Sequence, residues 1–312
     1  MKKVGDLVSL TAVFIMLFFL GLTILRTGLY QLSYEKMTYL LTNFTQNIYL
    51  AVITGTIATA ILQSSSLIMV LTVSFVSIGF ITFRQSIGII FGANIGTTVT
   101  GELMAFSNII PETSFVIIGA ILLFINNRAI FSIGAILVGL GTIFVALDGF
   151  ESLAPLITNM PILSESLLHT NNTPSFGVII GTLVSGTIQS SSATIGITMS
   201  ILNEGLITLP VSIAIVLGAN IGTCITALLA IIGTKKEAKL VAMGHFWFNI
   251  ISVLMFIPFL GWLSDLAQLL ASDVKEQLAH ISLLFNIFSV LIFLPFVNLF
   301  EKFIYKLHRK AV

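Results

Sequence analysis

The chain has 312 residues, of which 56% are hydrophobic and 9% are charged, and its formal net charge is +1. Ordinary soluble domains carry about 25% charged residues, so this composition excludes a soluble fold and predicts a chain surrounded largely by lipid. The small net charge argues against nucleic acid as a partner. The single cysteine excludes an internal disulfide and a cysteine-based metal cluster.

The first apolar segment is predicted to be a spanning helix that is not cleaved. It follows Lys2 and Lys3, runs from Leu7 to Leu25 and ends at Arg26. The apolar core of a signal peptide has only about 7–15 residues and ends at a small-residue cleavage site. This run is longer and lacks such a site.

Seven segments are long and apolar enough to span a bilayer. They lie near residues 6–30, 84–106, 112–127, 129–148, 208–232, 236–260 and 277–300. Two further stretches, about 47–81 and 174–205, are apolar arms interrupted by the sequence Gln-Ser-Ser-Ser. Each arm is short for a crossing of about 20 residues. We therefore expect two re-entrant hairpins with the serines at their tips, facing protein or a water-filled cavity.

The chain contains an internal repeat. Residues 55–103 reappear as residues 181–229 with a constant offset of 126 and no gap. Two polar blocks are retained in both copies. The first comprises Gln63, Ser64, Ser65 and Ser66, matched by Gln189, Ser190, Ser191 and Ser192; the second is Gly-Ala-Asn-Ile-Gly-Thr at residues 92–97 and 218–223. Polar blocks duplicated in an apolar chain are typical of transporters built from repeats.

We predict an all-α membrane protein in which each repeat has one span, one hairpin and two spans. Three spans is an odd number, so the second repeat must be inverted relative to the first. The expected boundaries are residues 1–127 for repeat 1, 128–260 for repeat 2, and 261–312 for an extra C-terminal span with a cytoplasmic tail.

The basic residues predict how the chain lies in the cell membrane. With the N-terminus outside and the C-terminus cytoplasmic, only Lys2, Lys3 and Lys275 lie outside, in agreement with the positive-inside rule. The cytoplasmic side then receives Arg26, Lys36, Arg84, Arg128, Lys235, Lys236, Lys239, Lys302, Lys306, Arg309 and Lys310.

The serine blocks are best explained as the starts of half-helices. Four consecutive polar residues on a continuous helix would spread about 300° around its axis, so one interface could not satisfy them. At a hairpin tip, unpaired backbone N–H groups and the positive helix end favour an anion, and the serine hydroxyls add donors. Two inverted tips could meet near the bilayer midplane and hold one ligand.

The second block predicts a cation site. Its glycines suit close helix packing, but packing alone does not need the polar side chains between them. A locally unwound span would free carbonyl and side-chain oxygens for a small hard cation such as sodium. The candidate ligands are Asn94, Thr97, Thr98, Asn220 and Thr223, with Ser65 and Ser191 as shared ligands.

Neither block contains a basic residue. A helix N-terminus contributes about 0.3–1 kcal/mol to an anion, which cannot offset the transfer of a phosphate-like dianion out of water. The sequence therefore predicts that co-bound cations supply the positive charge.

Three further polar positions have open roles. Glu102 follows the first glycine block by a turn, Asp148 closes a span, and His245 lies in an apolar helix. Cys224 stands where repeat 1 has Thr98, which makes the second site asymmetric. A shorter echo relates residues 248–259 to residues 285–296 and is interpreted as helix packing.

The paired serine and glycine blocks resemble the type II sodium/phosphate cotransporter family and its bacterial relatives. The resemblance implies sodium-driven uptake of inorganic phosphate, with phosphate and sodium at the two tips and the Asn and Thr side chains in unwound helices. Many bacterial relatives carry a PhoU-like regulatory domain after the membrane part. This chain is expected to lack it, which leaves its regulation open.

Other functions fit the sequence less well. An intramembrane serine enzyme would need a lysine or histidine base near the serine, and neither block contains one, so we expect no enzymatic activity. A passive anion channel would not explain paired cation sites. The sequence does not distinguish phosphate from sulfate, and it leaves open the sodium stoichiometry, the electrogenicity and the oligomeric state, including a homo-oligomer.

Overall fold

The computed structural model describes residues 2–43, 45–108, 111–160, 165, 169–234 and 236–308, with the main chain alone at 2, 3 and 34–43. Across these residues every regular element is an α-helix or a 3₁₀-helix, which confirms the predicted all-α class. Lys235, Arg309 and Lys310, used in the orientation argument, lie outside the described residues, as does the end of the expected cytoplasmic tail.

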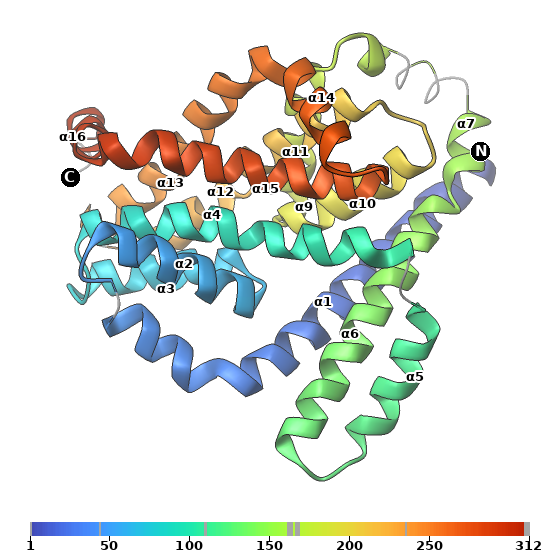
Figure 1. Cartoon of the computed structure of the whole chain (residues 1–312), viewed down its shortest axis with the longest axis horizontal. Coiled ribbons are helices and arrows are strands. Elements are labelled where there is room, and N and C mark those ends of the chain that lie inside the picture. Colours follow the sequence, from blue (N-terminus) through green and yellow to red (C-terminus); the bar gives the residue numbers. More distant parts are fainter. Residues whose placement is uncertain are drawn as a thin grey trace.

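Most of the described helices follow one another with short connections (Figure 1). The first half contains α1 (Lys2–Asn43), α2 (Ile48–Leu62), α3 (Ser65–Ser77), α4 (Phe83–Ala105), η1 (Phe106–Asn108) and α5 (Glu112–Leu123). The middle contains α6 (Arg128–Glu151), α7 (Ala154–Thr158), α9 (Phe176–Ile188), α10 (Ser191–Asn203), α11 (Leu209–Gly222) and α12 (Cys224–Ala230). The last part contains α13 (Lys236–Phe256), η2 (Ile257–Phe259), α14 (Leu260–Leu270), α15 (Val274–Phe293), η3 (Leu294–Phe296) and α16 (Val297–Leu307).

Six helical segments within the described residues are long and apolar enough to cross a membrane, one fewer than the sequence predicts. The exception is the segment 112–127, where α5 has only 12 residues. At 1.5 Å per residue it is ~18 Å long, shorter than the ~30 Å hydrocarbon core. Pro111 precedes the helix, and Asn127 accepts hydrogen bonds from the first N–H groups of α6. α5 therefore lies between Pro111 and the turn that leads to the start of α6.

The internal repeat is also present in the structure. α2, α3 and α4 of repeat 1 correspond to α9, α10 and α11 of repeat 2. The turns before α4 and α11 both contain a glycine with positive φ, Gly79 at 78° and Gly205 at 67°. Glycine adopts this left-handed conformation without the steric penalty of a Cβ atom, so both copies use the same turn.

Glycines bring the backbones of the paired helices into direct contact. A Cβ atom at Gly92 of α4 would collide with the carbonyl oxygen of Val52 in α2. Gly218 of α11 would collide in the same way with the carbonyl oxygen of Val178 in α9. The glycines of the second block therefore lock α2 onto α4 and α9 onto α11, as small residues do at membrane helix interfaces.

The predicted unwinding of the second block is wrong for repeat 1, because α4 is a continuous helix over Phe83–Ala105. Its polar side chains bond to their own helix: Asn94 Nδ2 donates to the Ile90 carbonyl at 2.9 Å, and Thr97 Oγ1 to the Ala93 carbonyl at 2.8 Å. In repeat 2 the interruption is limited to Thr223, between α11 and α12. Its N–H still donates to the Ala219 carbonyl, so few backbone oxygens are freed.

α1, α5 and α6 form a packed group of their own, and the α5–α6 hairpin extends away from the other helices (Figure 1). Glycines again mediate the contacts. Gly139 of α6 lies against Leu25 of α1, and Gly119 of α5 lies against Gly134 of α6. We call α1, α5 and α6 the arm.

The shorter echo in the sequence corresponds to a second structural duplication. α13, η2 and α14 have the same bounds as α15, η3 and α16 displaced by 37 residues, apart from the starts of α13 and α15. Phe248 packs on Phe293, and Phe256 packs on Phe285. Because 248 matches 285 and 256 matches 293, the two ring pairs are equivalent. The echo thus reflects helix packing, as the sequence predicts.

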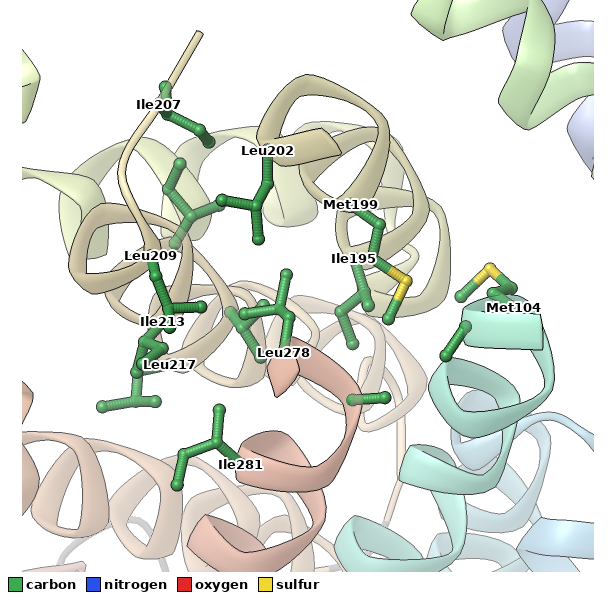
Figure 2. Close-up of a cluster of buried hydrophobic side chains, with 14 of the residues drawn as sticks. Met104, Ile195, Met199, Leu202, Ile207, Leu209, Ile213, Leu217, Leu278 and Ile281 are labelled. Carbon is green, nitrogen blue, oxygen red and sulfur yellow. The ribbon is translucent and has the colours of Figure 1, made fainter. Parts of the chain in front are cut away.

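One cluster of buried apolar side chains joins α10 and α11 of repeat 2 to α15. Figure 2 shows buried apolar side chains where α10 and α11 meet α15 and the end of α4. Met104 of α4 lies across from Met199 of α10, while Leu278 and Ile281 project from α15. This packing fixes α10, the helix that starts at the second serine block.

A buried ion pair connects the arm to this core. The Lys275 side chain at the start of α15 is 0% exposed, and its Nζ lies 2.6 Å from Glu151 Oε1 at the end of α6. Glu151 Oε2 accepts a hydrogen bond from Asn203 of α10 at 3.0 Å, and Lys275 Nζ bonds Ser107 Oγ of η1 at 3.0 Å. These polar contacts hold the ends of α6, α10 and α15 together.

We expect Lys275→Met to destabilise the protein by about 3–5 kcal/mol, because it leaves the Glu151 carboxylate buried without its counter-charge. Thermal unfolding of the purified protein in detergent measures the effect, and Lys302→Met on the exposed face of α16 is the control. The double variant Lys275→Met/Glu151→Met should recover part of the loss. An unfolding temperature for Lys275→Met equal to that of the control would contradict this role.

We expect Gly92→Ala to lower the stability by about 1–3 kcal/mol, because the added methyl forces α2 away from α4. Gly261→Ala in α14 is the matched control, since nothing lies within 4 Å of the position a Cβ would take there. The control should be neutral or stabilised by up to about 1 kcal/mol through helix propensity. Equal unfolding temperatures for the two variants would show that the close approach is dispensable.

Candidate functional site

The two serine blocks adopt the same local structure. Gln63 ends α2 and Gln189 ends α9 in the left-handed conformation, with φ of 49° and 56°. They are the two non-glycine residues with positive φ in the described part of the chain. The following residues, Ser64 and Ser190, cap α3 and α10 by accepting hydrogen bonds from the N–H groups of Leu67 and Ala193, both at 3.2 Å. Each block therefore ends one helix and starts another.

Backbone strain of this kind is informative. A non-glycine residue in the left-handed region costs of the order of 1 kcal/mol, and here it occurs at the same position of both repeats. Such strain gathers at functional sites, where it holds a useful geometry. Here the geometry ends α2 and α9 and places the N-termini of α3 and α10 at the serine blocks.

Both serine blocks line one cavity of about 170 Å³. At ~30 Å³ per water molecule this has room for a small anion with a few ions or waters. The structure thus brings together all eight residues predicted to bind substrate. The lining consists of Phe19, Arg26, Gln63, Ser64, Ser65, Ser66, Thr97, Thr100, Gln189, Ser190, Ser191, Ser192, Thr223 and Thr226.

The serines offer uncommitted hydroxyl groups to this cavity. Ser65 and Ser66 are half-buried, whereas Ser191 and Ser192 are buried at 5% and 6% exposure. Within the described residues, none of these four hydroxyls makes a hydrogen bond. A hydroxyl can donate one hydrogen bond and accept two. The cavity can therefore bind an anion through O–H and N–H donors, and a cation through the same oxygens.

A basic residue lies at the cavity, which corrects the prediction that all positive charge must come from co-bound cations. Arg26 of α1 is half-buried, and its Nε donates a hydrogen bond to the Gln63 carbonyl oxygen at 2.9 Å. It is the one charged side chain among the described residues that line the cavity. Sequence reasoning placed Arg26 at a cytoplasmic helix end, because a contact between residues 37 positions apart leaves no pattern in the sequence.

The two halves of the cavity differ in their hydrogen bonds. Gln63 is buried, and its Oε1 accepts a hydrogen bond from Thr100 Oγ1 at 2.8 Å. Its counterpart Gln189 is exposed, and Thr226 Oγ1 instead donates to the Thr223 carbonyl oxygen at 2.8 Å. The repeat 1 side is therefore fixed by Thr100 and Arg26, whereas the amide of Gln189 is left open.

The predicted sodium ligands divide into two groups. Thr97 and Thr223 line the cavity. Asn94, Thr98 and Asn220 are buried at 6%, 3% and 7% exposure but do not line it. The amide groups of both asparagines donate to a carbonyl four residues earlier in their own helix, at 2.9 Å in each case.

Sequence reasoning missed four lining residues, namely Phe19, Arg26, Thr100 and Thr226. Two of them carried a usable signal. Thr100 and Thr226 are identical at the repeat offset and follow Thr97 and Thr223 by about one turn. Threonine three residues further along a helix lies on the same face, so the repeat itself could have added them.

The three residues with open roles lie away from the cavity lining. Glu102 pairs with His280 of α15, whose Nδ1 lies 2.9 Å from Glu102 Oε2. Asp148 is exposed on α6. His245 is 4% exposed in α13, and its carbonyl oxygen accepts a hydrogen bond from Asn249 at 2.9 Å.

Among the described residues, no group of three or more His, Cys, Asp or Glu side chains is placed to hold a metal ion. The oxygens at the cavity are neutral hydroxyl, amide and carbonyl groups. Such oxygens suit a weakly held monovalent ion better than a transition metal, which prefers imidazole or thiolate ligands.

The comparisons with known proteins agree with this chemistry. The model of a family described as Na+/Pi-cotransporter matches residues 17–152 and 159–293. "Uncharacterized protein YqeW" of Bacillus subtilis is 38% identical over 96% of this chain and 98% of its own length. No solved structure matches the chain.

Two other relatives carry functional names. "Putative inorganic phosphate export protein YjbB" of Salmonella typhimurium is 25% identical over 93% of this chain. The chain spans 53% of the length of that protein. "Sodium-dependent phosphate transport protein 2B" of Homo sapiens is 38% identical over 30% of this chain and 14% of its own length.

We expect Thr100→Val to destabilise the protein by about 1–3 kcal/mol, because the buried Gln63 amide oxygen then loses its donor. Thr226→Val is the matched control, since Thr226 bonds only within its own helix region and should cost less. Thermal unfolding of both variants measures the difference. Equal losses would contradict the asymmetry of the two tips.

Proposed function

The chain belongs to the Na+/Pi-cotransporter family, and on this premise we propose that it couples the movement of inorganic phosphate across the cell membrane to that of sodium. The single observation that carries the proposal is the cavity lined by both serine blocks. Its hydroxyl and helix N-terminal donors suit a tetrahedral oxyanion. This is a transport site and needs no catalytic nucleophile.

The protein is a multi-pass membrane protein of this transporter family, with six apolar helices among the described residues. We propose that α2 with α3, and α9 with α10, are re-entrant hairpins. These four helices have 13 to 15 residues, so each is ~20–22 Å long and short of the ~30 Å core. Non-helical backbone at their tips is permitted because it lines a polar cavity.

We further propose that the two repeats are inverted, with the N-terminus outside and the C-terminus cytoplasmic. The excess of Lys and Arg on one side supports this orientation. An inverted arrangement requires α5 to complete a crossing. With 12 residues it can do so only if flanking residues contribute or the bilayer thins locally.

In the proposed binding mode, phosphate lies between the N-termini of α3 and α10. The hydroxyls of Ser65, Ser66, Ser191 and Ser192 donate to its oxygens together with backbone N–H groups. Sodium ions occupy the neighbouring oxygen-rich positions, with Thr97 and Thr223 as ligands. Three other predicted ligands would have to turn their side chains to reach an ion in the cavity, namely Asn94, Thr98 and Asn220. We therefore propose that they lie behind the sodium positions and do not bind the ions directly in this conformation.

Sodium provides the driving force in this scheme. Each elementary charge that moves down the membrane potential contributes about 2.3 kcal/mol per 100 mV. We propose import as the direction of net phosphate movement. Alternating access would come from movement of the arm relative to the helices that carry the tips.

Phosphate export is a second candidate direction. The relative YjbB, at 25% identity, has phosphate export in its name. Sulfate remains a competing oxyanion, because a cavity of hydroxyl donors recognises the tetrahedral shape more than the central atom. A passive channel is the alternative from another class.

We expect purified protein in liposomes to accumulate radiolabelled phosphate when sodium is higher outside, and to do so poorly when sodium is equal on both sides. Unlabelled sulfate added in excess measures how far the cavity discriminates between the two oxyanions. Phosphate accumulation that occurs only when sodium is higher inside the liposomes would favour export. Phosphate flux down its own gradient without any need for sodium would favour a channel. Sulfate uptake in place of phosphate uptake would move the substrate assignment to that oxyanion.

In the same assay, Ser65→Ala and Ser191→Ala should each reduce sodium-driven uptake at least about tenfold, because each loses a donor to a charged ligand worth about 1.5–3 kcal/mol. Ser74→Ala is the matched control, since Ser74 lies on the exposed face of α3 and bonds the Val70 carbonyl. Full uptake by both tip variants would remove the serine blocks from the binding site.

A further inference from the structure

Arg26 lies in the middle of a long apolar helix, in a position that requires explanation. It belongs to the apolar span Val4–Ser33 of α1 and is half-buried against the first tip. A charged side chain within a membrane helix is costly unless it faces protein or water and has a partner. The charged and hydrogen-bonding groups around Arg26 therefore indicate its role.

Among the described side chains, no carboxylate pairs with this arginine. The ion pairs of the described residues are Arg84 with Glu301, Lys275 with Glu151, and His280 with Glu102. None of them includes Arg26, and Glu and Asp are absent from the described lining of the cavity. Within the part of the chain that the structure describes, no carboxylate lies within salt-bridge distance of this positive charge.

Most of the donors of Arg26 are also uncommitted. A guanidinium carries five N–H groups in a planar fork. One of them, on Nε, is used by the Gln63 carbonyl oxygen. Within the described residues the two Nη groups make no hydrogen bond. Since Arg26 lines the cavity, these groups can bind two oxygens of an oxyanion in the bidentate mode typical of arginine and phosphate.

We propose that Arg26 binds the transported oxyanion directly and is its fixed counter-charge on the repeat 1 side of the cavity. This inference rests on the proposed function, because it assigns a residue to the same site. The bond to the Gln63 carbonyl holds the guanidinium beside the first tip, at the cavity that Ser64–Ser66 also line. No described residue of repeat 2 at the cavity carries a charge, so the anion is held asymmetrically.

A consequence follows for the role of sodium. A permanent positive charge in the cavity allows phosphate to bind before any sodium ion does, although more weakly. It also repels cations, so sodium is expected nearer to Thr223 and Ser191 than to Arg26. Sodium then drives transport and strengthens binding without being indispensable for it.

Binding of radiolabelled inorganic phosphate to the full chain in detergent tests the proposal, in sodium buffer and in a buffer where choline replaces sodium. The wild-type protein should bind phosphate in both, and more tightly with sodium. Arg26→Gln should lose about tenfold to a hundredfold in affinity with sodium, as expected for one charge-assisted hydrogen-bonded contact. Without sodium its binding should be undetectable.

Arg26→Lys distinguishes the effect of the positive charge from that of the planar guanidinium group. It keeps the positive charge and a donor for Gln63 but loses the planar fork, so its affinity should lie between those of the wild type and Arg26→Gln. The loss in Arg26→Gln should also be larger at a pH where phosphate is a dianion than where it is a monoanion. A purely structural role would not produce this dependence on the charge of the ligand. Arg84→Gln, at an exposed arginine of α4, is the control and should bind like the wild type.

The outcomes distinguish this inference from the function itself. Wild-type affinity in Arg26→Gln, or equal losses for monoanion and dianion, would overturn the role of Arg26. If Ser191→Ala loses phosphate binding in that case, the proposed function still stands. If the wild-type protein binds no phosphate and transports none, the proposed function fails first.

Discussion

The structure depends on one local interaction that occurs twice, a left-handed glutamine followed by a serine that caps a new helix. Without this turn, α2 and α3 would be one continuous helix, as would α9 and α10, and their serines would face several directions. With it, two helix N-termini and four uncommitted hydroxyls line a single cavity. In an apolar chain, unpaired polar groups of this kind are retained where a ligand completes them.

The glycine blocks support this arrangement without forming the site themselves. Gly92 and Gly218 allow α4 and α11 to contact the backbones of α2 and α9. That contact places Thr97 and Thr223 at the cavity, while the asparagines of the same blocks bond to their own helices. The glycine blocks thus hold α2 and α9, the helices that lead into the two tips, against α4 and α11.

The duplicated features were predictable from the sequence, because a repeat is visible in one dimension. The turns at Gln63 and Gln189, the half-helices and the shared cavity all follow from patterns present in both copies. The features without a repeat were not predictable. Arg26 reaches Gln63 across 37 residues, and no periodicity indicates that contact. The unwinding of α4 was predicted wrongly because side chains that can bind a cation can equally bond to the preceding helical turn. The helix at residues 112–127 was predicted too long, because hydropathy does not measure where a helix ends.

The central claim is that the two tips hold one anion together. A structure determined by electron cryo-microscopy in the presence of phosphate and sodium tests it most directly. The account predicts a single anion in contact with Ser65 or Ser66 on one side and Ser191 or Ser192 on the other. Anion density in contact with only one tip, or at a different place in the molecule, would contradict it.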